Sequence, residues 1–580
     1  MTTMSATAGG NVQGTLPVRA PDVRLLLFVV VLGVVSFLVV YPLALLLVSS
    51  FEVGRYGQET TLGLGNWRAV FNEPRLQNAI INTVTLTATR QGIAFLAGVF
   101  LAWLLARTNL PGRHWLEFGF WVAFLIPTLP VLLGWIFLLD GHSGLINQLV
   151  MSLPGVKTSP FEIYSWWGIV FVHLMTNTLV VKVMLLTPAF RNLDESLVEM
   201  ARVSGAGTLL TLFRVIIPIM APAILVVMLL GTIRSLEAFE IELILGSPQQ
   251  IDVYSTEIYR RVFGSPPDYG PATVLSMLIF VIIAPFVLLE QIIGRRRSRA
   301  SISARFSTGL YDLGRWRLPA FCLVLLLLGA MTLLPVAFMI LGSFMEIFGY
   351  FTVSGGTFTL RHWGTVLSDP RFLGALWDTL VIASSSAFIA MLLFPAIAYL
   401  IVRTRYLGRG ALDFLTWVPT TVPGIVIGLG FLWMFLEMPV LRPLYGTQAG
   451  LILAFTVAGM ALGVQLIKAG IMQISFELEE AARAGGATWL HTMRRVVVPL
   501  IAPTVLIVGV LAFVNATRAV STPVLLSSHT TQTLAVFQLK FIEAGNLEAA
   551  SVVGVVVLLM STGVAFVAHL FGLKFGLGGR

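Results

Sequence analysis

Twelve stretches of this chain are long and apolar enough to cross a membrane, and this feature limits its fold more than any other. A bilayer core about 30 Å thick requires about 20 apolar residues in one helix. Such stretches lie near 25–50, 79–106, 115–140, 166–188, 215–236 and 271–293, and again near 318–343, 375–402, 411–436, 450–472, 496–517 and 547–573. The sequence therefore predicts an all-α polytopic membrane protein with about twelve transmembrane helices.

The composition excludes most soluble classes of protein. Of the 580 residues, 57% are hydrophobic and 11% are charged, whereas soluble globular chains carry about 25% charged residues. A soluble multidomain enzyme would lack the charged surface that it needs. The single cysteine, Cys322, lies in an apolar stretch, which excludes a small secreted protein built on disulfide bonds. The stretch that begins at Leu25 exceeds the roughly 7–15-residue core of a signal peptide, so we expect it to remain as a helix.

The arginines indicate how the chain is oriented. Positively charged residues accumulate in the cytoplasmic loops of membrane proteins, which accounts for the net charge of +9 without a nucleic-acid partner. Seven arginines lie between the sixth and seventh apolar stretches, against one acid, Asp312: Arg295, Arg296, Arg297, Arg299, Arg305, Arg315 and Arg317. The loop at 237–270 is on the other side by count and leans acidic. We therefore expect both termini and the linker to be cytoplasmic.

The chain is also a tandem repeat. Matching residues recur 281 positions apart, as Glu199 and Glu480, Gly205 and Gly486, and Pro218 and Pro499. Upstream, Trp67 and Trp363, and Arg107 and Arg403, are 296 positions apart, so we expect an insertion of 15 residues in the first half around 141–165. Each half holds six apolar stretches, an even number, so both halves enter the membrane from the same side. The sequence thus predicts two parallel six-helix repeats.

These patterns divide the chain into five segments. They are a cytoplasmic tail (1–24), a first half (25–293), an arginine-rich cytoplasmic linker (294–317), a second half (318–573) and a short tail (574–580). Each half contains one polar loop between its fourth and fifth apolar stretches. We refer to these as the first loop (about 195–218) and the second loop (about 476–499).

Each loop is predicted to be two short helices with a break between them. Gly205 and Gly486 supply the break, because glycine adopts a turn conformation without a Cβ penalty. Apolar residues follow both breaks, as Leu209, Leu212 and Phe213 in one loop and Trp489, Leu490 and Met493 in the other. An apolar group on a cytoplasmic loop favours a groove of a partner protein. The alternative is an interfacial amphipathic helix that lies on the lipid headgroups.

The loop sequences resemble a known motif. A Glu-x-Ala pattern, a glycine and an alanine six and seven residues after the glutamate, and a later proline are similar to the EAA loop of ABC importer permeases. Each half also resembles the type I importer permease unit. The resemblance implies a bacterial inner-membrane subunit that works with a periplasmic substrate-binding protein and two copies of an ATP-binding subunit. It assigns docking to Glu199, Ala201, Gly205 and Ala206, and to Glu480, Ala482, Gly486 and Ala487. Met200 departs from the motif, which has alanine there.

Nothing in the sequence indicates enzymatic chemistry. The chain has no Gly-x-x-x-x-Gly-Lys-Ser/Thr phosphate loop, so we expect ATP and magnesium to bind on the separate ATP-binding subunit. The seven histidines are scattered without metal-ligand spacing. No serine lies in a Gly-x-Ser-x-Gly turn. We predict a transport subunit that binds no cofactor of its own and holds no firm metal site.

The fused, double-length form resembles the ferric iron uptake permeases most closely. The stretches that carry this resemblance are 234–240, 256–259 and 266–270. Related fused permeases are similar to importers of thiamine, aminoethylphosphonate or polyamines, so these cargoes remain open. Two readings outside this class are a secondary transporter, which would have no use for two docking loops, and a structural scaffold, which would not explain charges inside the membrane.

Ionisable residues at membrane depth are costly and often mark a transport path. The candidates are Arg90, Arg234, Glu237, Glu240 and Arg518, with Lys182 as a further buried charge. Glu237 and Glu240 share a helix face and offer hard oxygen ligands to a trivalent cation. The alternative is that Arg234 and Glu237 form only a structural pair. We also expect Pro127, Pro130, Pro419 and Pro423 to kink the third and ninth spans, and Gly424 and Gly428 to permit close helix contact.

Overall fold

The computed structural model describes residues 23–54, 60–193, 199–201, 203–298, 310–349 and 358–570. The predicted tail at 574–580 and nearly all of the tail at 1–24 lie outside these residues, as do 299–309 of the linker and 195–198 and 202 of the first loop. In the described part, two short strands, β1 (Glu52–Val53) and β2 (Thr61–Leu62), pair antiparallel, and helices make up most of the rest. The prediction of an all-α polytopic membrane protein is confirmed.

Ten helical segments of the described residues are long and apolar enough to cross a membrane. Those of the first half are α1 (Val23–Ser49), α3 (Pro74–Arg107), α7 with α8 (Trp166–Met175, Asn177–Arg191), η1 with α11 (Leu212–Ile216, Ile217–Leu236) and α13 (Tyr269–Ser298). Those of the second half are η4 with α14, η5 and α15 (Gly314–Trp316, Arg317–Leu328, Gly329–Leu333, Leu334–Gly342), α17 (Pro370–Arg403), α20 (Gln448–Gln473), α22 with η8 and α23 (Trp489–Thr492, Met493–Val497, Val498–Arg518) and α26 (Leu547–Leu570). Each coincides with one of the predicted apolar stretches.

The third and ninth predicted spans are sharply bent pairs of helices. The pair α4 (Arg113–Leu125) and α5 (Thr128–Leu139) bends by 97°. The pair formed by α18 with η6 (Arg409–Trp417, Val418–Thr421) and α19 (Gly424–Glu437) bends by 112°. Pro127 and Pro423 immediately precede α5 and α19, where a residue without an N–H is tolerated. The predicted kinks are therefore corrected to complete breaks.

One of the bent pairs runs beside a long apolar segment of the second half. α4 and α5 run beside α14 and α15 in the same direction, because a Cβ added to Gly119 would meet Leu328, one added to Gly134 would meet Pro335, and one added to Gly342 would meet Phe137. These contacts advance together along both segments. The α14–α15 segment belongs to a full-length span. The described part of the chain thus has ten candidate spans, or up to twelve if each bent pair is one span.

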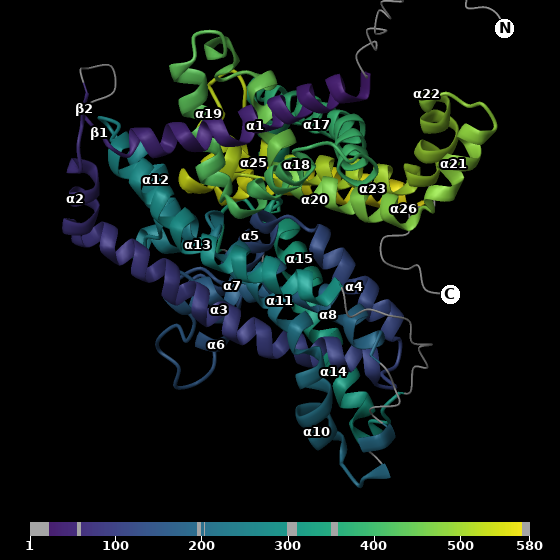
Figure 1. Ribbon diagram of the computed structural model, residues 1–580. Helices are drawn as coiled ribbons and strands as arrows, with labels where there is room; N and C mark the ends of the chain where they lie inside the picture. Colours follow the sequence, from purple (N-terminus) through teal and green to yellow (C-terminus); the bar gives the residue numbers. More distant parts are fainter. Residues whose placement is uncertain are drawn as a thin grey trace, which may run out of the picture.

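The first helix of each half packs against the other half. α1 lies along α18 and α19 of the second half (Figure 1), with the rings of Phe28 and Tyr406 5.4 Å apart and Pro42 against Gly430. In return, α14 and α15 of the second half pack on α4 and α5 of the first. The buried face of α1 includes Val35 and Leu46. Each half thus completes the apolar packing of its partner.

The repeat is visible in the bounds of the helices. α2 (Gly65–Asn72) and α16 (Arg361–Ser368) are 296 residues apart, as are α3 and α17. α10 (Thr208–Thr211) and α22, like the short π-helical turns η1 and η8, are 281 residues apart. The offset changes between α5 and α7, where the first half has α6 (Leu145–Met151) and the second has only η7 (Arg442–Leu444). The insertion therefore lies where the sequence predicted it.

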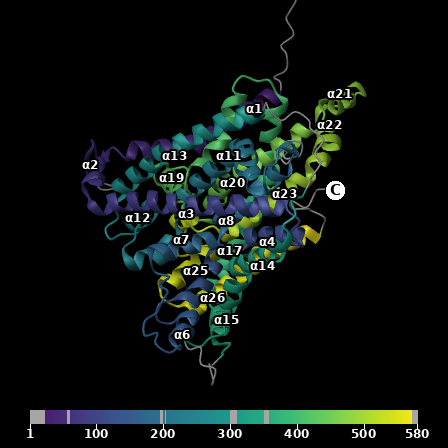
Figure 2. The same cartoon turned by 90° about the horizontal axis from the view of Figure 1, so that it is seen from below.

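The ends of the spans define two faces of the molecule. α2, β1 and β2 lie at the left of Figure 1, the pair α21 (Phe476–Ala484) and α22 lies at the right, and α10 lies at the bottom. Figure 2 again places α2 and α21 at opposite ends. Short helices near the left face include α12 (Tyr254–Val262) and α25 (Leu534–Glu543). We call the ends of the spans that carry α10 in the first half and α21 with α22 in the second the loop face, and the ends that carry α2 and α16 the opposite face.

Candidate functional site

The second loop forms the predicted helix–break–helix structure. Ser475 begins α21 by accepting a hydrogen bond from the N–H of Glu477, and the helix ends at Ala484. Gly486 then adopts φ = +83°, while the N–H of Ala487 donates to the carbonyl of Ala482 at 3.0 Å. This is the geometry of a Schellman ending, in which glycine is favoured because the left-handed conformation strains other residues.

The first loop repeats this turn. Gly205 has φ = +80°, and the N–H of Ala206 donates to the carbonyl of Ala201 at 3.0 Å. Nothing lies within 4 Å of a Cβ added to Gly205 or Gly486. The requirement for glycine is therefore one of backbone conformation and not of space.

The loops expose only part of the predicted apolar surface. Leu490 is 69% exposed and Phe213 is 64% exposed, whereas Leu212 is buried in the first half and Trp489 is half-buried. Met493 is also half-buried, and the side chain of Leu209 lies outside the described residues. Leu212 was thus wrongly assigned to the surface, because η1 turns it toward the core. Glu199 and Glu480 are both exposed.

A buried ion pair anchors the second loop, and the sequence reasoning missed it. The side chain of Glu479, one residue before the predicted docking glutamate, is fully buried and lies 2.8 Å from Nε of Arg403. The hydroxyl of Tyr399 donates to the other carboxylate oxygen at 3.1 Å, and Nη2 of Arg403 donates to the carbonyl of Ile474. These contacts join α21 to the end of α17. The recurrence of arginine at positions 107 and 403 of the repeat was the sequence signal that could have pointed to this ion pair.

Interrupted helices from both halves converge inside the molecule. α11 ends at Leu236, and helix resumes after 237–239, leading into η2 (Glu242–Gly246). α23 ends at Arg518, and α24 (Ser521–Leu526) follows after 519–520. Nη1 of Arg518 donates to the carbonyl of Phe124, at the end of α4, at 2.8 Å. Irregular backbone at membrane depth is tolerated only inside protein or along a water-filled cavity.

Four of the five predicted path residues gather at this convergence. Arg234 and Glu237 are paired at 3.3 Å, as the structural alternative predicted. The carboxylate of Glu240 lies beside the backbone of Val520 and near Arg518, and Arg234 also lies near Arg518. Two arginines and two glutamates thus lie together where the halves meet. They can face cargo groups of either charge.

Arg90 and Lys182 do not join this group. Arg90 is 2% exposed and pairs with Glu242 at 2.6 Å, behind the interruption of α11. Lys182 is equally buried, and its ammonium donates to the carbonyl of Thr178 within α8. Both were expected as charges at membrane depth, but each faces protein. In the described part of the chain, no group of three or more His, Cys, Asp or Glu residues is placed to hold a metal ion.

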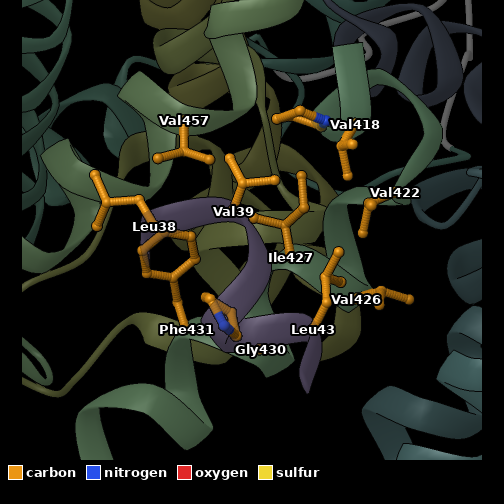
Figure 3. Close-up of a pocket in the computed structure, with 12 residues that line it drawn as sticks. Leu38, Val39, Leu43, Val418, Val422, Val426, Ile427, Gly430, Phe431 and Val457 are labelled. Atoms are coloured by element: carbon orange, nitrogen blue, oxygen red, sulfur yellow. The ribbon is translucent and has the colours of Figure 1, made fainter. Parts of the chain in front are cut away.

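The seam between α1 and the second half has a different character. Figure 3 shows a pocket there, between α1, η6 and α19, whose lining includes Leu38, Val39, Leu43, Val426 and Phe431. Its lining residues are all apolar. A charged group placed there would lose its hydration without gaining any polar partner. Gly424 and Gly428 lie nearby and contact Ser521 and Thr522 of α24, which confirms the predicted close approach.

Charged side chains form a second network at the opposite face of the first half, in which buried carboxylates meet partly exposed arginines. Arg75 at the start of α3 pairs with Asp252 at 3.1 Å and with Glu257 at 2.8 Å, and Arg260 pairs with Asp252 at 2.7 Å. Burial raises the pKa of both carboxyl groups, and the neighbouring Arg75 opposes that rise. The acidic loop predicted at 237–270 thus contributes to an ion network.

Similarity to known proteins covers both halves of the chain. The family model described as "Binding-protein-dependent transport system inner membrane component" matches residues 94–299 and 391–575. The ferric transport system permease protein FbpB of Actinobacillus pleuropneumoniae is 26% identical over 91% of this chain and 75% of its own length. The probable ABC transporter permease protein y4fN of Sinorhizobium fredii is 27% identical over 84% of this chain and 85% of its own.

Two further similarities cover one half only. The putative 2-aminoethylphosphonate transport system permease protein PhnU of Salmonella typhimurium is 26% identical over 46% of this chain and 92% of its own length. A solved structure of a bacterial alginate ABC transporter, in complex with an alginate pentasaccharide-bound periplasmic protein, matches with a TM-score of 0.40 and 21% identity. It covers 48% of this chain and 96% of that chain.

Proposed function

The chain belongs to the family of binding-protein-dependent transport system inner membrane components, as an ABC importer permease, and we propose that its cargo is ferric iron. It is a transport subunit, and ATP hydrolysis takes place on a separate subunit. The ferric permease of Actinobacillus pleuropneumoniae supports the cargo because its match extends over 91% of this chain and includes both halves. The match to the phosphonate permease is limited to 46%.

One copy of the ATP-binding subunit docks on each loop. The two loops share the same turn, with Gly205 and Gly486 in the left-handed conformation. Both present an exposed glutamate and several exposed apolar side chains, among them Phe213 and Leu490. Two equal loops at one face suit two equal partners. The loop face is cytoplasmic, in keeping with the arginines of the linker, and a periplasmic binding protein delivers cargo to the opposite face.

The path runs through the convergence of interrupted helices. This location is the observation that carries the proposal, because it combines charged side chains with broken backbone at the boundary between two repeats. Glu237 and Glu240 provide oxygen ligands that suit a hard trivalent cation. A second candidate cargo is a phosphonate, which Arg234 and Arg518 favour through charge-assisted hydrogen bonds to an oxyanion.

The test is transport by the complete importer in proteoliposomes, with its ATP-binding subunit and its binding protein loaded with ferric iron. We expect the double variant Glu237→Gln and Glu240→Gln to lower iron uptake about tenfold, as the loss of charged contacts implies. Stimulation of ATP hydrolysis by the loaded binding protein should remain, because the loops are unchanged. Glu346→Gln, an exposed glutamate distant in the chain from this path, is the matched control.

Full uptake of iron by the double variant would contradict the proposed path. Loss of uptake of aminoethylphosphonate on Arg518→Gln, together with the absence of iron uptake by the unmodified importer, would instead establish the second cargo. Misassembly of the double variant would support the alternative in which Glu237 only neutralises Arg234.

A further inference from the structure

A single buried arginine binds both sides of the interruption that follows α11, at residues 237–239. Arg90, in the middle of α3, donates from Nε to the hydroxyl of Ser235 and from Nη2 to the carbonyl of Ser235, just before the interruption. Its Nη1 donates to Glu242 at 2.6 Å, just after the interruption. The planar guanidinium is suited to this role because it presents several donors in a fixed geometry.

The contacts of Arg90 belong to a closed set of buried groups. Glu242 is 1% exposed and also contacts Nε2 of His173, from α7, at 2.9 Å. The carbonyl of Ala238, inside the interruption, accepts a hydrogen bond from the hydroxyl of Ser255 at 2.6 Å. Carbonyl groups freed from a helix inside a membrane protein need such partners. The interrupted segment is therefore held in one conformation by side chains from three other elements.

The second half has an interruption without this device. The positions that correspond to Arg90, His173, Ser235 and Glu242 in the repeat are Ser386, Ala454, Ala516 and Pro523. None of these side chains is charged, yet α23 and α24 are separated at the equivalent place. An interrupted helix in this fold thus forms without a buried ion pair. The ion pair occurs in the half whose interruption carries Glu237 and Glu240.

We propose that Arg90 and Glu242 act as a positioning pair, which fixes the segment 237–241 so that Glu237 and Glu240 face the path. This inference rests on the proposed function for the direction of its effect on transport. The part of the inference that concerns the conformation of the segment is independent of the proposed function and can be measured separately. Neither Arg90 nor Glu242 contacts the cargo.

The test removes both charges together. Replacing one partner would leave the other charge buried and unpaired, which is strongly destabilising, whereas Arg90→Gln with Glu242→Gln keeps polar groups that can bond to each other. We expect this double variant to assemble, to hydrolyse ATP normally with the loaded binding protein, and to transport about tenfold fewer cargo molecules per ATP. Ser386→Ala, at the corresponding place in the second half, is the control and should be neutral.

The conformation of the segment provides a readout that needs no cargo. In a background of Cys322→Ser, a cysteine introduced by Ala238→Cys should react about tenfold faster with a water-soluble maleimide when the positioning pair is removed. Unchanged labelling and unchanged transport per ATP would overturn the inference. Faster labelling with normal transport would support the role of the pair in holding the segment, but it would contradict the proposed path.

A second variant guards against simple misfolding. Arg90→Lys keeps the charge, but a lysine ammonium lacks the fork needed to reach both Ser235 and Glu242. We expect this variant to assemble and to transport fewer cargo molecules per ATP, with a smaller loss than in the double variant. If both variants fail to assemble, the pair is only structural and the inference is overturned.

Discussion

At the scale of single residues, the two loops depend on a backbone conformation that glycine alone adopts without strain. Gly205 and Gly486 have φ near +80° and open space around the position of a Cβ. A β-branched residue there would cost about 1–2 kcal/mol through backbone strain, and no neighbour would clash. The effect of substitution can therefore be assigned to the turn itself.

We expect Gly486→Val to weaken binding of the ATP-binding subunit and to reduce transport, with normal insertion into the membrane. Gly205→Val should act in the same way. The combined variant should be more impaired than either, because in the proposed function each loop binds its own copy of the ATP-binding subunit. Gly485→Ala is the matched control, since Gly485 has φ = −75°. Affinity measured by titrating the ATP-binding subunit onto the reconstituted permease decides the matter. Equal affinity for both substitutions would contradict the docking role of the turn.

Two adjacent glutamates in the second loop have opposite surroundings, and they should respond differently to the same change. Glu479→Gln leaves Arg403 buried without its counter-ion, so we expect the anchor between α21 and α17 to weaken by about 3 kcal/mol. Glu480→Gln alters only an exposed side chain and should leave the loop folded while it weakens docking. Hydrogen exchange of α21 distinguishes them. Equal protection in both variants would show that the buried pair contributes nothing to the anchor.

At the scale of elements, the bent pairs show how a proline and its surroundings produce a break. Proline removes one donor and favours the start of a helix, so Pro127 and Pro423 permit α5 and α19 to begin afresh. The direction of the new helix depends on packing, chiefly against α15 for α5 and against α24 and α1 for α19. The bend is therefore a property of the pair of packed elements.

The contact between α5 and α15 allows a graded test. A Cβ added to Gly134 would lie 1.9 Å from the carbonyl oxygen of Pro335, which is rigid backbone, whereas one added to Gly119 would meet the end of the flexible Leu328 side chain at 2.9 Å. We expect Gly134→Ala to lower the free energy of unfolding by about 1–3 kcal/mol and Gly119→Ala to have a smaller effect. Thermal unfolding of the purified protein in detergent would show the difference. A smaller loss for Gly134→Ala would contradict the close packing of α5 on α15.

At the scale of the whole molecule, the exchange of first helices makes each half dependent on the other. α1 covers the second half, and α14 with α15 covers the first (Figure 1). Expressed alone, either half would expose an apolar surface shaped for protein and would lose the packing that its partner's first helix supplies. We expect the two halves to form one folding unit, although this chain is also similar to single-length relatives such as PhnU.

We therefore expect a chain cut in the linker at 301–309 to be active when both pieces are expressed together. Each piece alone should be degraded, because its partner helix is missing. Membrane abundance and ATP-driven uptake of the co-expressed pieces provide the measurement. Stable accumulation of one piece alone would contradict the dependence between halves.

Sequence periodicity and repetition determined the long apolar helices, the two repeats and the position of the insertion. They did so because a membrane requires long apolar helices and because a duplicated unit repeats its own local signals. The left-handed turns at Gly205 and Gly486 also followed from sequence, since they depend on backbone chemistry within a few residues. The bounds of α3 and α17 repeat at the predicted offset for the same reason.

Only the tertiary structure decided which charges meet. Arg234, Glu237, Glu240 and Arg518 all lie near span ends, but their convergence depends on how the two halves pack, and the same packing turns Arg90 toward Ser235 and Glu242. The buried role of Glu479 and the exchange of α1 also escaped prediction. Side-chain direction at one turn of a helix, and the choice of a partner hundreds of residues away, depend on long-range contacts that no local sequence pattern contains.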